Sequence, residues 1–245
     1  MIIDIHSHIR RLGDNQKKAE EELLFDMQRN HVDFRVVSCL DGGSVEENNE
    51  YISAFVSRHP DKLAGCAVIN PKEKDCVAQC EKALSMPGMK MIELQPLRHG
   101  YYPDHCEGVE EVINAAEKMG AAVKVFTGMG ANGMPQQWIK HVERHPHTSF
   151  IFLHMGCFDY GYGCVDLASR YPNVYLETSN QYEVQILKKS ISAAPREKLL
   201  FGSSYPERLT RCSLDVYDMF HMDEEWKADV FGGNADRLLH LWEKK

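Results

Sequence analysis

The sequence has no apolar run that approaches the roughly 20 residues of a membrane-spanning helix, so we expect no membrane insertion. It also has no Ser/Pro-rich linker, low-complexity tract or block of like charges. We therefore predict a single domain over residues 1–245. The first residues have the pattern of a histidine-bearing strand rather than that of a signal peptide, so we expect a cytoplasmic protein.

Basic residues and paired cysteines are also scarce. Lysine and arginine total 28 against 36 aspartates and glutamates, which gives a formal net charge of −8. Nucleic-acid phosphates call for a basic surface, so we expect no nucleic-acid partner. The eight cysteines include no CxxC pair, and a chain of this length needs no disulfides to fold, so we expect most of them to be reduced and buried.

Strand-like and helix-like segments alternate along the whole chain. Such alternation with short connections is typical of a parallel sheet with helical crossovers, and eight repeats in about 250 residues match a closed barrel. We therefore predict an α/β fold of the (β/α)8 TIM-barrel type. The predicted strands are Ile2–His6, Phe34–Leu40, Leu63–Ile69, Met89–Gln95, Ala121–Thr127, Thr148–His154, Asn173–Thr178 and Lys198–Gly202. The predicted helices are Gln16–Asn30, Val45–Arg58, Glu73–Leu84, Glu107–Met119, Pro135–Arg144, Gly163–Tyr171, Glu183–Ser190 and Leu209–Phe220, and a last segment spans about Asp223–Trp242.

The first strand carries two histidines two residues apart. Side chains alternate along a strand, so Asp4, His6 and His8 share one face, and the apolar residues share the other. We expect the apolar face to meet the helices and the polar face to point into the barrel mouth. Two imidazoles on one face can reach one metal ion through bonds of ~2.0–2.1 Å. The alternative is a pair of polar histidines satisfied by water or carboxylates.

The sixth strand also ends in a histidine. By alternation, Phe150, Phe152 and His154 share a face, and Gly156 lets a ligand approach the backbone closely. His154 is therefore a candidate metal ligand or general acid/base. The alternative is a core histidine whose hydrogen bonds are satisfied.

Several motifs in order resemble the amidohydrolase-related family of metal-dependent hydrolases, which includes aminocarboxymuconate-semialdehyde decarboxylase and related lactonases. The resemblance implies a TIM barrel of the metal-dependent hydrolase type, with its site at the carboxyl ends of the strands. The motifs are Asp4-Ile-His6-Ser-His8, Gly88-Met-Lys90, Thr127-Gly128, His154-Met-Gly156, Asn173-Val-Tyr-Leu-Glu-Thr-Ser179, Leu200-Phe-Gly-Ser203, Tyr205-Pro206 and Gly233-Asn234-Ala235.

Two positions depart from the pattern of this family. The pattern has a histidine ligand where Phe126 stands. It also has an aspartate, which binds metal and handles the proton of the reacting water, where Ser204 stands. Phenylalanine offers no donor atom, and a neutral hydroxyl is a poor substitute for a carboxylate. His154 could compensate by joining the histidines of the first strand, because three imidazoles with an open position form a known zinc site.

Three charged residues complete the candidate site. Glu93, near the end of the fourth strand, is a candidate catalytic or ligating carboxylate if it points inward, and an ion pair with Arg98 or Lys90 is the alternative. Lys124 is expected to point inside the barrel, where a buried ammonium needs a partner, and Asp4 is the expected one. Arg98 is the candidate substrate-binding residue, since a guanidinium binds carboxylates bidentately.

A further cluster, His141, Glu143, His145 and His147, spans the end of the fifth large helix and the turn into the sixth strand. That position belongs to the face of the barrel opposite the mouth. We therefore expect a solvated surface there and no metal site.

The sequence supports two functions. The first is a hydrolase of an amide, lactone or ester, or a non-oxidative decarboxylase, that acts on a small carboxylate-bearing molecule. A divalent ion, zinc or manganese, would be held by His6, His8 and His154 and would polarise a carbonyl or lower the pKa of a bound water. With no aspartate at position 204, the catalytic base would be His154, Glu93 or Asp4.

The second function is that of a barrel that has lost metal catalysis and serves as a binding or regulatory protein. The residues Phe126 and Ser204 favour this alternative. For either function the expected partner is a small molecule, and a homodimer is the assembly that the resemblance suggests, because related barrels are often dimers.

Overall fold

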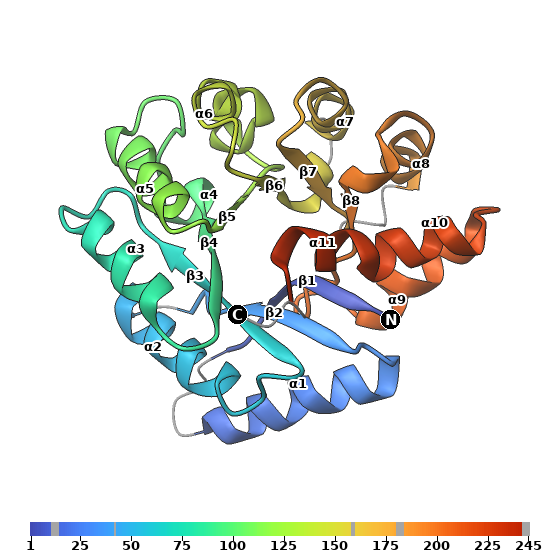
Figure 1. The fold of residues 1–245 in the computed structure, drawn as a ribbon, viewed down its shortest axis with the longest axis horizontal. Coiled ribbons are helices and arrows are strands. Elements are labelled where there is room, and N and C mark those ends of the chain that lie inside the picture. Colours follow the sequence, from blue (N-terminus) through green and yellow to red (C-terminus); the bar gives the residue numbers. More distant parts are fainter. Residues whose placement is uncertain (11–14, 42, 158–159, 180–183, 242–245) are drawn as a thin grey trace.

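The computed structural model describes residues 1–10, 15–41, 43–157, 160–179 and 184–241. One sheet of eight strands in the order β1 to β8, parallel at every strand pair, lies at the centre with helices around it (Figure 1). The predicted (β/α)8 barrel is confirmed. The strands are β1 (Ile3–His8), β2 (Phe34–Ser38), β3 (Leu63–Ile69), β4 (Met89–Leu94), β5 (Ala122–Val125), β6 (Phe150–Phe152), β7 (Val174–Glu177) and β8 (Leu199–Leu200).

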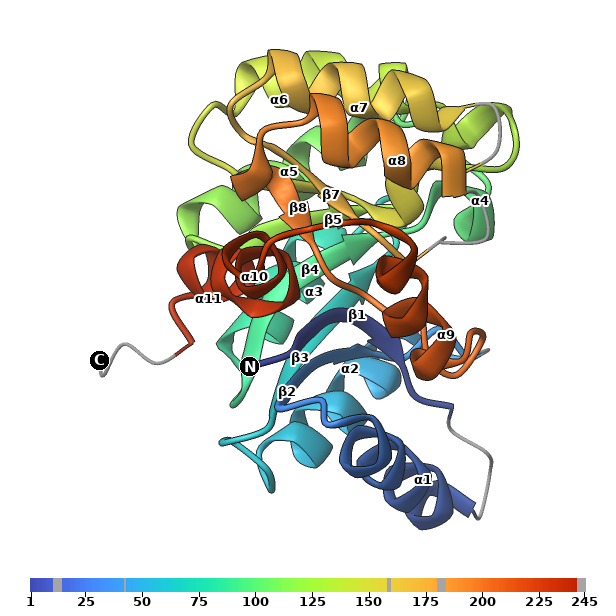
Figure 2. The same ribbon diagram turned by 90° about the vertical axis from the view of Figure 1, so that its right-hand side faces the viewer.

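The helices lie outside the sheet, with α6, α7 and α8 on one side and α1 and α2 on the other (Figure 2). A short helix, α4, directly follows β4 in the loop that the sequence leaves without structure. The predicted positions 183 and 242 lie outside the described residues. The α-helices are α1 (Gln16–Asn30), α2 (Val45–Val56), α3 (Cys76–Ser85), α4 (Pro96–His99), α5 (Glu107–Lys118), α6 (Ile139–Arg144), α7 (Gly161–Arg170), α8 (Val184–Ala193), α9 (Thr210–Asp215), α10 (Glu224–Ala228) and α11 (Asn234–Leu239).

The barrel is nearly closed by the segment that follows β8, because β8 itself has only two residues. The amide of Ile5 donates to the carbonyl oxygen of Phe201 at 3.0 Å, and the amide of Ser204 donates to that of His6 at 2.8 Å. A parallel bridge between Ser7 and Tyr205 continues this seam. The residues after β8 are thus held against the end of β1, where the candidate site lies.

The barrel interior contains an apolar core to which every strand contributes. Ile3 and Ile5 belong to this core together with Val36, Met91 and other residues of the neighbouring strands, so the apolar face of β1 points inward. The sequence-based expectation for this face is therefore wrong. The reason is a register shift between β1 and β2 from Asp4 to Ser7, after which the side chains exchange faces.

Asp4 lies on the side of β1 that faces the helices, so the expectation that it points into the mouth is also wrong. Its carboxylate lies 2.9 Å from Nε of Arg35, which in turn contacts Asp26 of α1 at 2.9 Å. It also accepts hydrogen bonds from the amide and hydroxyl of Ser203, at 2.9 and 2.6 Å. Asp4 thereby ties β1 to β2 and to the segment after β8, and it is not available as a catalytic base.

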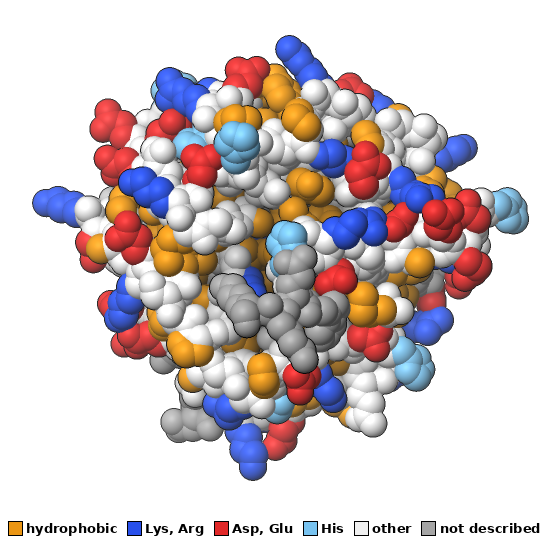
Figure 3. All heavy atoms as spheres, in the orientation of Figure 1, with side chains coloured by type: hydrophobic (Ala, Val, Ile, Leu, Met, Phe, Trp, Pro, Cys, Tyr) orange, Lys and Arg blue, Asp and Glu red, His pale blue; other side chains and the backbone are white. Residues whose placement is uncertain are grey.

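The surface and the cysteines agree with a folded domain of mixed charge. Acidic and basic side chains are interspersed over the face shown in Figure 3. Among the described residues, no helix has both the length and the apolar character needed to cross a membrane. All eight cysteines are free thiols, as predicted, and six of them are buried.

Candidate active site

A cleft of about 630 Å³ opens at the carboxyl ends of the strands. Its lining residues follow six different strands, as expected for the catalytic face of a barrel. The strand-end residues among them are His8, Leu40, Gln95, Phe126, His154 and Ser204, and the charged residues are Arg10, Asp41, Arg98, Glu207 and Arg208.

Three imidazoles gather at and beneath the floor of this cleft. His6 is fully buried, and its ring centroid lies 4.6 Å from that of His8 and 5.1 Å from that of His154. Burial lowers the pKa of all three, with a smaller contribution from neighbouring positive groups, and it brings that of His154 to about 3. All three rings are therefore uncharged at neutral pH, which is the state that binds a metal ion.

His154 reaches this position by a left-handed turn and not by strand alternation. Strand β6 ends at Phe152, and His154 and Met155 have φ values of 60° and 49°. Phe150 and Phe152 pack in the larger core cluster, whereas Ile151 belongs to the interior of the barrel. The prediction that the two phenylalanines share a face with His154 is therefore wrong, although the turn still brings the ring into the mouth.

Two parallel chains of hydrogen bonds orient His8 and His154, the two histidines that line the cleft. Nδ1 of His8 lies 2.9 Å from the hydroxyl of Ser38, which donates to Glu93 at 2.9 Å. On the other side, Nδ1 of His154 lies 2.8 Å from the hydroxyl of Ser179, which donates to Glu177 at 2.8 Å. Each serine gives its one proton to a glutamate and so accepts from Nδ1–H.

The tautomer that follows from these chains is the same for both rings. A neutral imidazole with its proton on Nδ1 carries a lone pair on Nε2. The Nε2 atoms of His8 and His154 are thus the atoms that can bind a metal ion or accept a proton.

Glu93 is buried among donors and pairs with Lys124, not with Arg98 or Lys90. Its Oε2 lies 3.0 Å from Nζ of Lys124, and its Oε1 accepts a hydrogen bond from Gln95 at 2.5 Å. Burial raises the pKa of Glu93, but Lys124, His8 and the hydrogen bond from Gln95 lower it to about 2. The expectation that Lys124 pairs with Asp4 is wrong, because Asp4 lies on the side of β1 that faces the helices, where it pairs with Arg35.

Glu177, on β7, was not singled out by sequence reasoning, although it stands inside a motif of the family. It is fully buried, and burial raises its pKa to about 8. A Cβ atom on Gly202 would lie 2.1 Å from its Oε1, so the glycine leaves the space that the carboxyl occupies. The sequence feature that could have identified Glu177 is a glutamate at the end of β7 combined with a glycine just after β8. These two strands are neighbours, so the two residues are expected to meet.

Two groups of candidate metal ligands occur among the described residues, and His6 belongs to both. One consists of His6, His154 and Glu177, and the other of His6, His8 and Glu93, with ligand atoms within 4.8 Å of one another in each. His8 and His154 do not share a group, so one ion bound by all three histidines would require side-chain movement. That predicted ligand set stays a prediction.

The first of these groups fits a divalent transition metal. Nε2 of His6 is buried and has no hydrogen-bond partner among the described residues, and the ring of His154 lies beside Glu177, with its Nδ1 3.9 Å from Oε2 of that residue. A nearby dication favours the carboxylate form of Glu177 despite its burial. Two imidazoles and one carboxylate form a donor set that suits zinc or manganese.

The two departures from the family pattern lie beside this group. The ring of Phe126 lies 5.6 Å from that of His154, edge to face, and lines the cleft as an apolar wall. Ser204 has a φ of 54° and holds the backbone of His6 through its amide. Neither residue supplies a charged ligand, so Glu177 is the carboxylate nearest to His154.

The rim of the cleft is rich in arginine. Arg98, at the end of α4, is exposed and makes no ion pair with a described residue, so its guanidinium is free to meet an anion. Arg10 is already engaged with Glu207 at 3.0 Å, and Arg208 completes the basic side of the rim. A planar carboxylate would find an aromatic wall and a cationic rim in this cleft.

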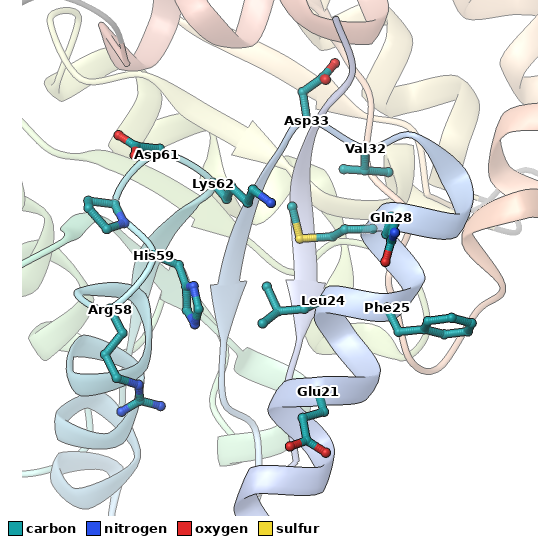
Figure 4. A pocket seen from close by; sticks show the side chains of 12 residues that line it. Glu21, Leu24, Phe25, Gln28, Val32, Asp33, Arg58, His59, Asp61 and Lys62 are labelled. Atoms are coloured by element: carbon teal, nitrogen blue, oxygen red, sulfur yellow. The ribbon is translucent and has the colours of Figure 1, made fainter.

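A larger hollow of about 780 Å³ lies at the opposite end of the barrel (Figure 4). Its walls come from α1 and from the turn between α2 and β3, and Asp33 and Lys62 precede β2 and β3. In TIM barrels the amino ends of the strands support stability and the carboxyl ends support chemistry. We therefore assign no site to it.

The histidine cluster at the end of α6 lies away from the mouth, and only part of it is the solvated surface that the sequence suggests, because Glu143 and His147 are exposed. His141 and His145 are buried, and their Nδ1 atoms lie 2.6 and 2.8 Å from Glu110 and Glu117 of α5. These pairs hold α6 against α5. The expectation was wrong for His141 and His145, because their acceptors come from a helix about 30 residues earlier in the chain.

Comparisons with known proteins agree with this architecture. A family model described as Amidohydrolase matches residues 3–241. A search of curated proteins found no match. Among solved structures, an uncharacterised TIM-barrel protein from Bordetella bronchiseptica aligns with a TM-score of 0.81 and 19% identity over 98% of both chains.

Two further structures are decarboxylases. The 5-carboxyvanillate decarboxylase from Sphingomonas paucimobilis aligns with a TM-score of 0.75 and 17% identity over 98% of both chains. The dihydroxybenzoic acid decarboxylase from Polaromonas sp. JS666, with bound manganese and the inhibitor 2-nitroresorcinol, aligns with a TM-score of 0.75 and 15% identity over 99% of this chain and 98% of that one. At these identities the likeness shows the fold.

Proposed function

The chain belongs to the amidohydrolase family, and from this premise we propose that it is a metal-dependent decarboxylase of a small aromatic carboxylate. The observation that carries the proposal is that His6, His154 and Glu177 meet beneath a cleft whose rim carries Arg98. The decarboxylase activity of two structural relatives, one of them with bound manganese, supports the same reaction class.

We propose that a divalent ion is held by His6, His154 and Glu177. When bound, it supplies a Lewis acid that orients the substrate and stabilises negative charge. Glu177 provides the carboxylate that the family pattern places at position 204. Because zinc and manganese both accept imidazole and carboxylate ligands, metal analysis must decide between them.

Decarboxylation fits the residues better than hydrolysis. In the family pattern the aspartate at position 204 takes the proton of the reacting water, and the serine of this chain does not supply that base. In decarboxylation the bond between the ring carbon and the carboxylate breaks, the electron pair stays on the carbon, carbon dioxide leaves, and a proton adds to the carbon. The site must therefore deliver a proton, and it must hold a planar anion between the Phe126 wall and Arg98.

His8 is the residue placed to move that proton. It lines the cleft, and its Nδ1 is fixed by Ser38, so Nε2 faces the substrate space. Glu93 holds Ser38 in turn and therefore acts as a positioning residue rather than as a base. In this proposal Nε2 of His8 first accepts a proton from solvent, and the imidazolium then gives that proton to the ring carbon and returns to its neutral form.

The direct test is to purify the protein without chelator, measure zinc and manganese by elemental analysis, and assay a panel of hydroxybenzoates for release of carbon dioxide. Metal-dependent release from at least one compound is the expected result. A parallel panel of lactones, esters and amides serves as the control for reaction class. Turnover of that panel, with no release of carbon dioxide from the first, would refute the decarboxylase assignment.

Replacing His8 or His154 by alanine is expected to separate the two roles. His154→Ala should lose bound metal, because it removes a ligand. His8→Ala should retain metal but lose roughly 10²–10⁴-fold in kcat, the usual contribution of general acid–base catalysis. Metal content and kcat of the two purified variants check this, and equal metal loss in both would favour a shared three-histidine site.

Replacing Arg98 by alanine is expected to raise KM about tenfold or more with a smaller change in kcat. A charge-assisted, bidentate contact to a carboxylate is lost, while the reacting groups stay in place. The matched control is Arg10→Ala, since Arg10 is already paired with Glu207. A KM unchanged from that of the unmodified enzyme would remove Arg98 from the substrate site.

A further inference from the structure

The side chain of a lysine lies among the candidate metal ligands His6, His8 and Glu93. Lys124, on β5, is fully buried inside the barrel, and its Nζ lies 3.0 Å from Oε2 of Glu93. The same Nζ lies 3.3 Å from Nδ1 of His6 and 3.4 Å from the carbonyl oxygen of Ile5. The ammonium thus stands between the carboxylate and the imidazole that would otherwise bind one cation.

The geometry of Glu93 shows that the pocket is built around this ammonium. Both carboxylate oxygens are engaged, Oε1 by Gln95 and Oε2 by Lys124 and Ser38, and the side chain has no exposed surface. A buried carboxylate requires a cation or several donors nearby. The chain supplies that cation itself.

We propose that the ammonium of Lys124 is a resident cation that excludes a divalent ion from the His6, His8 and Glu93 group. This inference rests on the proposed function, because it places the metal ion on the His154 side of His6. A divalent ion beside Glu93 would meet a fixed positive charge at bonding distance from two of its ligands. Without that charge, the same three residues form the two-histidine, one-carboxylate set of known zinc sites.

The proposal also gives different roles to the two ring nitrogens of His6. An ammonium has only donors, so Lys124 donates to the lone pair of Nδ1 of His6, and the ring proton of the metal-free chain lies on Nε2. For Nε2 of His6 to bind the ion on the His154 side, this proton must move to Nδ1, and Lys124 must turn away from it. The ammonium then keeps Glu93 and the carbonyl oxygen of Ile5 as acceptors. Lys124 is therefore not a ligand, and it determines which side of His6 can be occupied.

The test is a titration of metal-free protein with zinc, followed by dialysis and elemental analysis. The unmodified chain is expected to bind one equivalent. Lys124→Met, which removes the charge at similar volume, is expected to bind a second, with His6 losing its ring proton to solvent and bridging the two ions as an imidazolate. The double variant Lys124→Met/Glu93→Gln should return to one equivalent, because the second site loses its carboxylate. Lys124→Arg, which keeps the charge, should also bind one.

The outcomes separate this inference from the proposed function. Two equivalents in the unmodified chain, or no gain in Lys124→Met, would overturn the role of Lys124 while leaving a metal-dependent decarboxylase intact. No metal in the unmodified chain with one equivalent in Lys124→Met would support Lys124 as the excluding cation and refute the metal on the His154 side. If Lys124→Met does not fold, Lys124→Gln, whose amide still donates to Glu93, is titrated instead, and the same criteria decide.

Discussion

Replacing His6 by alanine is expected to abolish both metal binding and decarboxylation. His6 is the one residue shared by the two candidate ligand groups of the described chain, and its Nε2 is buried without a partner. Metal content should fall from about one equivalent to near zero. Stabilisation by a Lewis acid is worth several kcal/mol, and 1.36 kcal/mol is tenfold in rate, so activity should fall roughly 10³-fold or more.

The matched control for this prediction is His105→Ala. His105 follows α4 near the same face, but its side chain is 80% exposed, and its Nδ1 lies 2.8 Å from the carboxylate of the neighbouring Asp104. Metal content and kcat should be unchanged in that variant. Circular dichroism checks that His6→Ala is folded. A folded His6→Ala protein that retains a full equivalent of metal would show that the ion binds elsewhere.

The fold could be predicted from the sequence because it depends on local patterns. Alternating strand-like and helix-like segments predicted all eight strands, although β6 and β8 are shorter than the sequence suggests. Strand alternation correctly predicted that the histidines of β1 lie at the mouth, but alternation alone does not explain why they do. His6 and His8 face inward because the register shift after Asp4 exchanges the faces of the strand, and alternation alone predicts the opposite face for Ile3 and Ile5.

The site was predicted in outline, and its misses have a common physical cause. The partner of Lys124 is Glu93 on the neighbouring strand, and the carboxylate nearest to His154 is Glu177. Which side chains meet inside a barrel depends on the register of adjacent strands, and a shift of one residue changes every pair. No pattern within β5 or β7 contains that information. The left-handed turn at His154 is similarly invisible, because non-glycine residues rarely adopt it.

The presence of Glu177 also bears on the alternative of a barrel that has lost catalysis. That alternative depends on the missing ligands at Phe126 and Ser204. The structure offers a carboxylate from the adjacent strand, in the space that Gly202 leaves open. A chain that had lost its metal would have no need to keep a buried carboxyl group beside two uncharged imidazoles, so we favour the enzyme.

Among the proposed substitutions, Arg35→Met is expected to lower the free energy of unfolding the most. Its guanidinium is fully buried between Asp4 and Asp26, and it stacks over the ring of Tyr205 at 4.9 Å. The approach of Nε to Asp4 is an ion pair rather than a well-aligned hydrogen bond, so charge carries most of the interaction. Removing one partner of a buried pair costs about 3–5 kcal/mol, because the other charge stays buried.

At roughly 2–4 °C per kcal/mol for a chain of this size, Tm should fall by about 6–20 °C in a thermal melt. Arg10→Ala is the matched control, because its pair with Glu207 is exposed and such pairs contribute little. The double variant Arg35→Met/Asp4→Asn should recover part of the loss, since it removes both charges. A single variant that melts like the control would mean that Asp4 is held by Ser203 alone, and that the seam between β1 and the segment after β8 does not need the arginine.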